Sequence, residues 1–190
     1  MLSHFRPALV LMGLFTVLLG LAYPLAVTGV AQAAFPVQAN GSLVRDTSGT
    51  VVGSTLIGQA FAAPQYLHPR PSAAGAGYDA SASGGSNMGP INEALARRVK
   101  ADADALRAEN PGVVIPADAV TTSASGLDPD ISPAYAHLQA ARVAKARGLA
   151  KSQVEAVIDA HVQGRLLGFI GQPRVNVLAV NRALDARAPG

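Results

Sequence analysis

Residues 7–34 contain no charged side chain, and this run constrains the chain more than any other feature. An α-helix rises about 1.5 Å per residue, so about 20 apolar residues cross the hydrocarbon core of a bilayer. The run is longer than this and predicts one transmembrane helix, with room for some tilt. Pro24 lies in its second half and removes a backbone donor, which predicts a bend there.

A cleaved signal peptide is the alternative interpretation of this run. Arg6 supplies a positive start, and Ala31 and Ala33 on either side of Gln32 resemble a small-residue cleavage site. The apolar part of a signal peptide spans about 7–15 residues, however, and this run is nearly twice as long. The length therefore favours a retained anchor.

The orientation of the anchor follows from Arg6, the positive charge beside the run. Basic flanks of a transmembrane helix stay in the cytoplasm. We therefore expect residues 1–6 in the cytoplasm, residues 7–34 in the bilayer and residues 35–190 as a domain outside the cytoplasm.

Composition narrows what the domain can do. The chain has no cysteine, which excludes thiolate catalysis, Cys-ligated zinc and iron–sulfur clusters. It has 15 Lys and Arg against 12 Asp and Glu, and no Trp, so a nucleic-acid partner is not expected. Few aromatic residues predict a core of Leu, Val, Ile and Ala.

Local patterns predict an α+β fold, with the transmembrane helix followed by a single soluble mixed domain. Two β-prone segments, 42–45 and 50–57, flank a turn at 46–49 and predict a hairpin. Residues 90–109 have helical periodicity, with Pro90 at the first position, and residues 113–115 suggest a short strand.

The C-terminal third predicts two more helices. Ser132 is the expected N-cap of a helix at 133–147, which Gly148 ends. A helix at about 150–162 would bury Val154, Val157, Ile158 and His161 on one face. The pattern at 173–184 fits a strand and a helix equally well.

Residues 59–90 are irregular and become rich in Gly, Ser and Ala. A loop of about 30 residues in a compact domain is normally functional or disordered. Low complexity favours disorder, but Tyr66, Arg70, Tyr78 and Asp79 are side chains that a spacer does not need.

The stretch 81–90 leads into a helix, so it suits either an anion site or a tight loop with an N-cap. It lacks the Gly-Lys-Ser/Thr of a phosphate-binding loop, and Ser86 lacks the glycine spacing of a nucleophile elbow. No catalytic residue is therefore expected. The four histidines have no metal-site spacing, and Asp128 and Asp130 suit a helix entry better than a calcium loop, so no metal site is expected.

The motifs in these loops, in their order along the chain, resemble the KdpC family, the C subunit of the Kdp potassium-transporting P-type ATPase, over nearly the whole length. The matching pieces are 53–59, 64–66, 70–73, 78–79, 83–87, 89–90, 125–129, 131–133, Gln139, 142–144, Gly171, 173–178 and Asn181.

The resemblance implies an accessory, non-catalytic subunit in the bacterial cell membrane, with one transmembrane helix. Its implied partners are a channel-like subunit that passes K⁺, a P-type ATPase subunit that hydrolyses ATP, and membrane lipid. The family is described as a catalytic chaperone that raises the ATP affinity of the ATPase subunit. No tightly bound cofactor is implied; ATP would be reached through the complex.

The resemblance also implies roles for particular residues. Gln139 matches the glutamine proposed to touch nucleotide. Partner or structural roles are implied for Tyr66, Arg70, Tyr78, Asp79, Ser83, Gly84, Gly85, Ser86, Asn87, Asp128, Arg174 and Asn176.

The predicted orientation conflicts with direct nucleotide contact, because it places Gln139 outside the cytoplasm, where there is no ATP. It favours a domain that packs on the channel-like subunit and shapes K⁺ entry, with an allosteric effect on ATP affinity. The alternative from another class is a free-standing anchored periplasmic binding module or hydrolase, for which the sequence offers no nucleophile–base pair.

Overall fold

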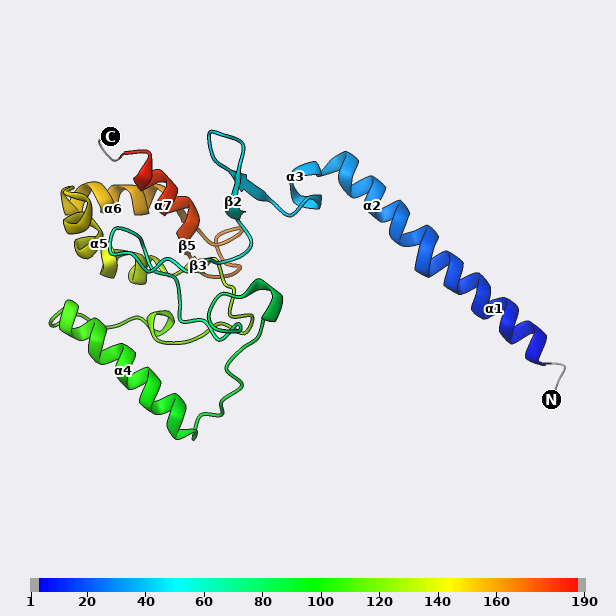
Figure 1. Cartoon of the computed structure of the whole chain (residues 1–190), viewed down its shortest axis with the longest axis horizontal. Coiled ribbons are helices and arrows are strands. Elements are labelled where there is room, and N and C mark those ends of the chain that lie inside the picture. Colours follow the sequence, from blue (N-terminus) through cyan, green and yellow to red (C-terminus); the bar gives the residue numbers. More distant parts are fainter. Residues whose placement is uncertain (1–3, 188–190) are drawn as a thin grey trace. The chain divides into compact units, whose positions relative to one another are not determined.

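The computed structural model describes residues 4–187 and divides the chain into two compact units, one up to Val52 and one from Gly53 onward (Figure 1). A long apolar helix is followed by a soluble mixed domain of helices and small sheets, which confirms the predicted fold class. The sidedness assigned to residues 1–6 and 35–190 stays a prediction.

The first unit is dominated by an apolar helix of 30 residues, Phe5–Ala34, with a mean hydropathy of 2.2, long and apolar enough to cross a membrane. It consists of α1 (Phe5–Val17), a π-helical turn η2 (Leu18–Ala22) and α2 (Tyr23–Ala34). Pro24 cannot donate to the carbonyl four residues before it, and its ring crowds that carbonyl. The widened turn η2 ends two residues before Pro24. The bend at Pro24 itself stays a prediction.

A short helix α3 (Pro36–Ala39) leads to the predicted hairpin, with strands β1 (Leu43–Arg45) and β2 (Val51–Ser54). The Asp46 carboxylate closes the turn by accepting from the backbone N–H of Ser48 at 2.9 Å. The hairpin prediction is confirmed.

Three of the helices in the second unit pack with one another and with a small sheet. The helices are α5 (Pro133–Arg147), α6 (Lys151–Ala160) and α7 (Val177–Asp185). Ser132 caps α5 by accepting from the Tyr135 N–H at 3.0 Å, and Gly148 ends it at φ 67°, as predicted.

The sheet is antiparallel, with β5 (Arg174–Asn176) between β3 (Asp130–Ile131) and β4 (Val162–Gln163). Val175 pairs with Ile131 on one side and with Val162 on the other. Residues 173–184, which fitted both a strand and a helix, therefore contain β5 followed directly by α7.

The core has the composition that the sequence predicts, mostly Val, Ala, Leu and Ile. Val154, Val157 and Ile158 are buried on α6, as predicted, whereas His161 is only partly buried at the helix end. The residues of this core with no more than 1% exposure include Leu67, Ala136, Ala140, Val143, Val154, Val157, Ile158, Val175, Val180 and Leu184.

Two local predictions are wrong. Helix α4 (Glu93–Glu109) begins after Pro90, because the Asn92 side chain caps it by accepting from the Ala94 N–H at 2.8 Å. Residues 113–115 form no strand in the described structure, and Val114 is 87% exposed.

Candidate functional site

The two Gly/Ser-rich loops, 72–89 and 121–129, pack directly on each other. Ser83 Oγ and the Gly84 N–H both donate to the Ser125 carbonyl, at 2.9 Å each. Ser72 Oγ donates to the Gly126 carbonyl at 2.7 Å and accepts from the Tyr78 N–H at 2.8 Å. The loop motifs therefore form one polar network.

Arg70 lies at the centre of this network. Its guanidinium pairs with Asp128 at 2.9 Å and donates to the backbone carbonyls of Thr121 and Thr122 at 3.3 Å. The Tyr78 hydroxyl donates to the Arg70 carbonyl at 2.6 Å. Burial, the main cause, raises the pKa of Tyr78 above its ordinary value, so this donor keeps its proton at neutral pH.

Gly126 allows the close approach of the two loops. Its φ is 67°, and a Cβ there would lie 2.6 Å from the Ala74 nitrogen and 2.7 Å from the Gly84 oxygen. Any larger residue would have to push the backbones of the two loops apart.

A pair of side-chain amides holds the chain just before Arg70. Asn181 on α7 accepts from the Leu67 N–H at 2.7 Å and donates to the Leu67 carbonyl at 3.0 Å. Gln139 on α5 makes the same two bonds to His68, at 2.7 and 3.0 Å. We call this arrangement the amide clamp: Asn181 and Gln139 on Leu67 and His68.

The amide clamp gives the extended backbone at Leu67 and His68 the hydrogen bonds that neighbouring strands would give it in a β-sheet. Successive residues of an extended chain direct their N–H and C=O groups to opposite edges. Asn181 satisfies one edge from α7, and Gln139 satisfies the other from α5. Leu67 is fully buried, so these bonds serve backbone groups in the interior.

Two arginines of α5 extend the clamp toward Pro64. Arg142 donates to the carbonyls of Pro64 at 2.7 Å and Tyr66 at 3.1 Å, and to Gln139 Oε1 at 2.6 Å. Arg147 donates to the Gln65 carbonyl at 2.7 Å and lies over the Tyr66 ring at 5.2 Å. The irregular segment 64–72 thus has a defined place between helices.

The other predicted residues near the sheet also bond within the domain. Asn176 caps α7 by accepting from the Ala179 N–H at 3.0 Å, and it donates to Thr55 and Asp130 at 3.1 Å each. Arg174 pairs with Asp130 at 2.9 Å. Burial raises the pKa of Asp130, although the bonds from Asn176 and Arg174 oppose this shift.

The remaining predicted residues are less central. Asp79 caps a 3₁₀ turn, η3 (Ala80–Ala82), through Ser81 at 2.9 Å, and a Cβ on Gly85 would lie 3.1 Å from the Ala124 carbonyl. Ser86 and Asn87 follow this contact, and Asn87 has φ 51°. No side-chain hydrogen bond joins these two residues to the described part of the chain.

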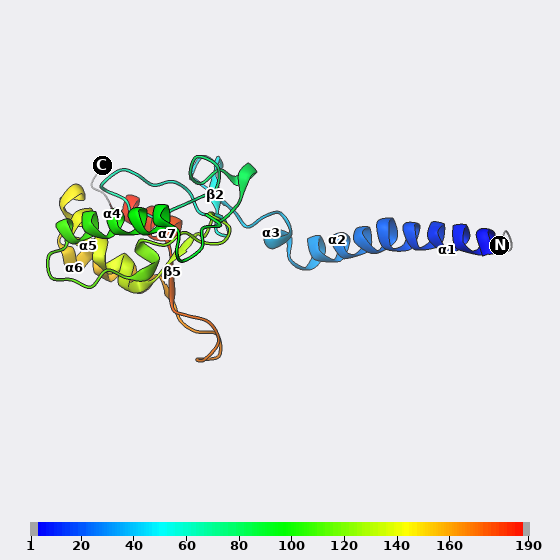
Figure 2. The same cartoon turned by 90° about the horizontal axis from the view of Figure 1, so that it is seen from below.

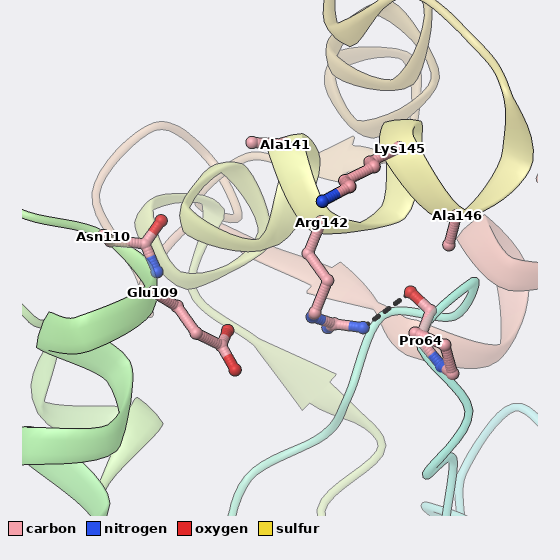
Figure 3. A pocket seen from close by; sticks show the side chains of 7 residues that line it. All are labelled: Pro64, Glu109, Asn110, Ala141, Arg142, Lys145 and Ala146. Carbon is pink, nitrogen blue, oxygen red and sulfur yellow. Dashed lines mark hydrogen bonds between the residues drawn. The ribbon is translucent and has the colours of Figure 1, made fainter.

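A groove of about 600 Å³ runs beside the clamp, between the end of α4 and one face of α5 (Figure 3). Glu109 lies on one wall and Arg142 and Lys145 on the other, and Figure 3 shows Arg142 bonded to Pro64. Gln139 is not among the lining residues. Because the Arg142 guanidinium already bonds the clamped segment, it is poorly placed to bind a ligand in the groove.

The site is structural in its chemistry. Within residues 4–187, no group of three potential metal ligands is present. The predicted residues Tyr66, Arg70, Tyr78, Ser83 and Asp128 meet backbone groups, rings or each other, so these contacts hold the loops in place.

No site role was predicted for Asn181, Arg142, Arg147 or Ser72. Asn181 and Gln139 lie 114 and 71 residues from their partners, so no local pattern identifies the pairs.

Comparison with known proteins gives a consistent result. Residues 5–186 match the family described as KdpC: K⁺-transporting ATPase, c chain. A relative from Caulobacter sp. (strain K31) is 81% identical over 189 residues, covering 100% of this chain and 96% of the relative. A relative from Beijerinckia indica subsp. indica is 62% identical, and the match covers 100% of this chain and 96% of the relative. A relative from Myxococcus xanthus is 58% identical, and the match covers 98% of this chain and 90% of the relative. Each is named potassium-transporting ATPase KdpC subunit.

Proposed function

Since the chain belongs to the KdpC family, the c chain of the K⁺-transporting ATPase, we propose that it stabilises the assembled pump and raises the ATP affinity of the ATPase subunit from a distance. It is a non-catalytic membrane subunit of a K⁺ transporter, with one candidate transmembrane helix. Its proposed partners are the channel-like subunit and the P-type ATPase subunit, and its proposed place is the bacterial cell membrane.

The state of Gln139 carries the proposal of an indirect effect. This side chain is 4% exposed, and its oxygen and nitrogen both bond the His68 backbone. A nucleotide would have to displace these bonds and leave buried groups unpaired, at a cost of about 1–3 kcal/mol each. This supports allostery over direct nucleotide contact, which remains the alternative.

An indirect effect needs two states of the ATPase subunit that the accessory subunit contacts differently. We propose that the second unit lies outside the cytoplasm, packs on the channel-like subunit near the K⁺ entrance and favours the nucleotide-binding state. The orientation rests on Arg6, the basic residue at the start of the apolar helix.

Orientation is tested by labelling, because the chain has no native cysteine. Ser48→Cys and Ser152→Cys place one exposed thiol in each unit. In intact spheroplasts, we expect a membrane-impermeant maleimide to label both. Protection of both until the membrane is opened would put the domain in the cytoplasm and favour nucleotide contact at Gln139.

The proposed effect on ATP affinity and assembly is tested with the purified complex, prepared with and without this chain. We expect its omission to raise the KM for ATP of the remaining subunits and to reduce their recovery as a complex. An unchanged KM together with full recovery would refute the proposed function.

A further inference from the structure

A hairpin between β4 and β5 projects from the rest of the second unit (Figure 2). Leu166 and Ile170 close it through two backbone hydrogen bonds of 2.9 Å. Leu166, Leu167, Phe169 and Ile170, which we call the hairpin tip, are 66, 75, 71 and 48% exposed. Adjacent apolar side chains exposed in this way usually mark an interaction site.

The hairpin tip makes a tight turn. Leu167 has φ 54° and Gly168 has φ 83° between the paired residues. A leucine with positive φ is uncommon and typically marks a tight turn. Arg165 braces the neck by donating to Gln172 at 3.1 Å, and Val175 of β5 fixes the base in the core.

We infer that the hairpin tip inserts into an apolar pocket with an acidic rim on the membrane-embedded, cation-conducting partner subunit. This inference rests on the proposed function, because it places the second unit on that subunit. It adds the element of this chain that makes the contact and the chemistry of the surface that receives it.

Size argues against a second copy of this chain as the occupant. A stable interface covers about 800 Å² on each partner, whereas exposed apolar patches typically measure about 300–600 Å². Four side chains are too few to hold two copies together. They suffice as an additional contact for a chain already held nearby by its helix, since tethering raises the effective concentration.

Charge and composition favour a protein pocket over a lipid surface. Residues 160–184 contain no Asp or Glu, and Arg165 lies at the edge of the hairpin tip. Recognition of anionic lipid typically needs about 4–8 clustered Lys or Arg, and interfacial anchors are typically Trp or Tyr. The hairpin tip has neither. An aromatic and leucine centre edged by Arg fits a protein interface, and acidic groups line the mouths of cation-conducting pores.

Crosslinking in the intact complex in native membranes tests the contact. p-Benzoylphenylalanine replaces Phe169 in one variant and Ile91, which is 96% exposed, in the control. We expect light to join position 169, and not position 91, to the membrane-embedded subunit. Adducts of position 169 with lipid or with a second copy, or no adduct, would overturn the inference.

Retention measurements give a second, independent readout. Leu167→Ser with Phe169→Ser is compared with the control pair Ile91→Ser and Val114→Ser during washing of the complex in mild detergent. We expect the tip variant to dissociate about tenfold faster than the control, as for loss of an interface hot spot. Equal rates would overturn the inference.

The outcomes separate this inference from the proposed function. If the unaltered chain co-purifies and lowers the KM for ATP while the tip and control variants behave alike, only the inference fails. If the unaltered chain neither co-purifies nor changes the KM, the proposed function fails.

Discussion

The segment 64–72 and the hairpin 164–173 are both irregular, yet they relate to the fold in opposite ways. In the first, Leu67 is fully buried, and its backbone bonds a side chain 114 residues away. In the second, the bonds stay within the hairpin and the apolar side chains face outward. The source of the hydrogen-bond partners therefore separates a structural loop from a binding loop more clearly than secondary structure does.

The largest expected effect comes from breaking the inward-facing segment at Asn181. Asn181→Leu leaves the buried N–H and C=O of Leu67 unpaired, which costs about 3–5 kcal/mol in the free energy of unfolding. Calorimetry of the detergent-solubilised full chain should show a melting temperature lower by about 10 °C.

Asn110→Ala is the control for Asn181, since the Asn110 side chain makes one hydrogen bond, to the Leu106 carbonyl near the end of α4. It should cost no more than about 1 kcal/mol. If the two variants melted together, the amide clamp would not be a main determinant of stability.

The contact between the loops should respond to Gly126→Ala. Gly126 and Gly112 both have positive φ, at 67° and 76°, so alanine costs about 1 kcal/mol in backbone strain at either. Only at position 126 does the new Cβ meet backbone atoms, which adds about 2 kcal/mol of overpacking. Chemical denaturation of both variants measures the difference, and equal losses would contradict the observed loop packing.

Gln139→Glu sharpens the distinction between a structural and a nucleotide-binding glutamine. Glutamate keeps the acceptor for the His68 N–H but loses the donor to the His68 carbonyl, at a cost of about 2 kcal/mol. Asn181→Asp makes the equivalent change on Leu67. If the clamp acts as a unit, both variants should shift the KM for ATP of the complex in the same direction.

A shift with Gln139→Glu alone, at equal stability loss, would instead support direct nucleotide contact. The paired variants are needed because either change by itself also weakens the domain.

The smallest effect concerns pH and the side chain of His68, whose backbone belongs to the amide clamp. Burial first, and then the Arg142 guanidinium, hold the pKa of His68 below its ordinary value of 6.5. As pH falls below 6.5, the unfolded chain takes up a proton that the folded chain does not, so stability falls until the folded pKa is passed. The ring is only partly buried, so we expect a loss below about 1 kcal/mol.

His68→Gln should flatten this slope in melting temperatures measured between pH 7 and 5. Exposed carboxylates with lowered pKa, such as Asp46, Asp79 and Asp104, lose stability only at more acidic pH and fall outside this window. An unchanged slope in the variant would exclude His68 as its cause.

Elements with local signals could be predicted from the sequence. The apolar helix follows from length, the hairpin from its Asp and Gly turn, and α5 from Ser132, Pro133 and Gly148. The start of α4 was misplaced because Pro90 and Asn92 are competing start signals, and the Asn92 side chain makes the cap.

The rest depends on distant contacts. Residues 113–115 are β-branched but find no partner strand, and β3 and β4 are too short to show alternation. The residues of the candidate site were recognised only by resemblance. The partners of the Arg70 guanidinium and the backbone partner of Gln139 lie 51–71 residues away. The apolar run 166–170 carries no local signal that distinguishes an exposed tip from core.

The amide clamp also sets the order in which the chain can mature. Leu67 is made 114 positions before Asn181, so the clamp cannot close until Asn181 has left the ribosome. Contacts of such large sequence separation form late in folding. The segment around Leu67 therefore cannot take its final place in the core before Asn181 is available.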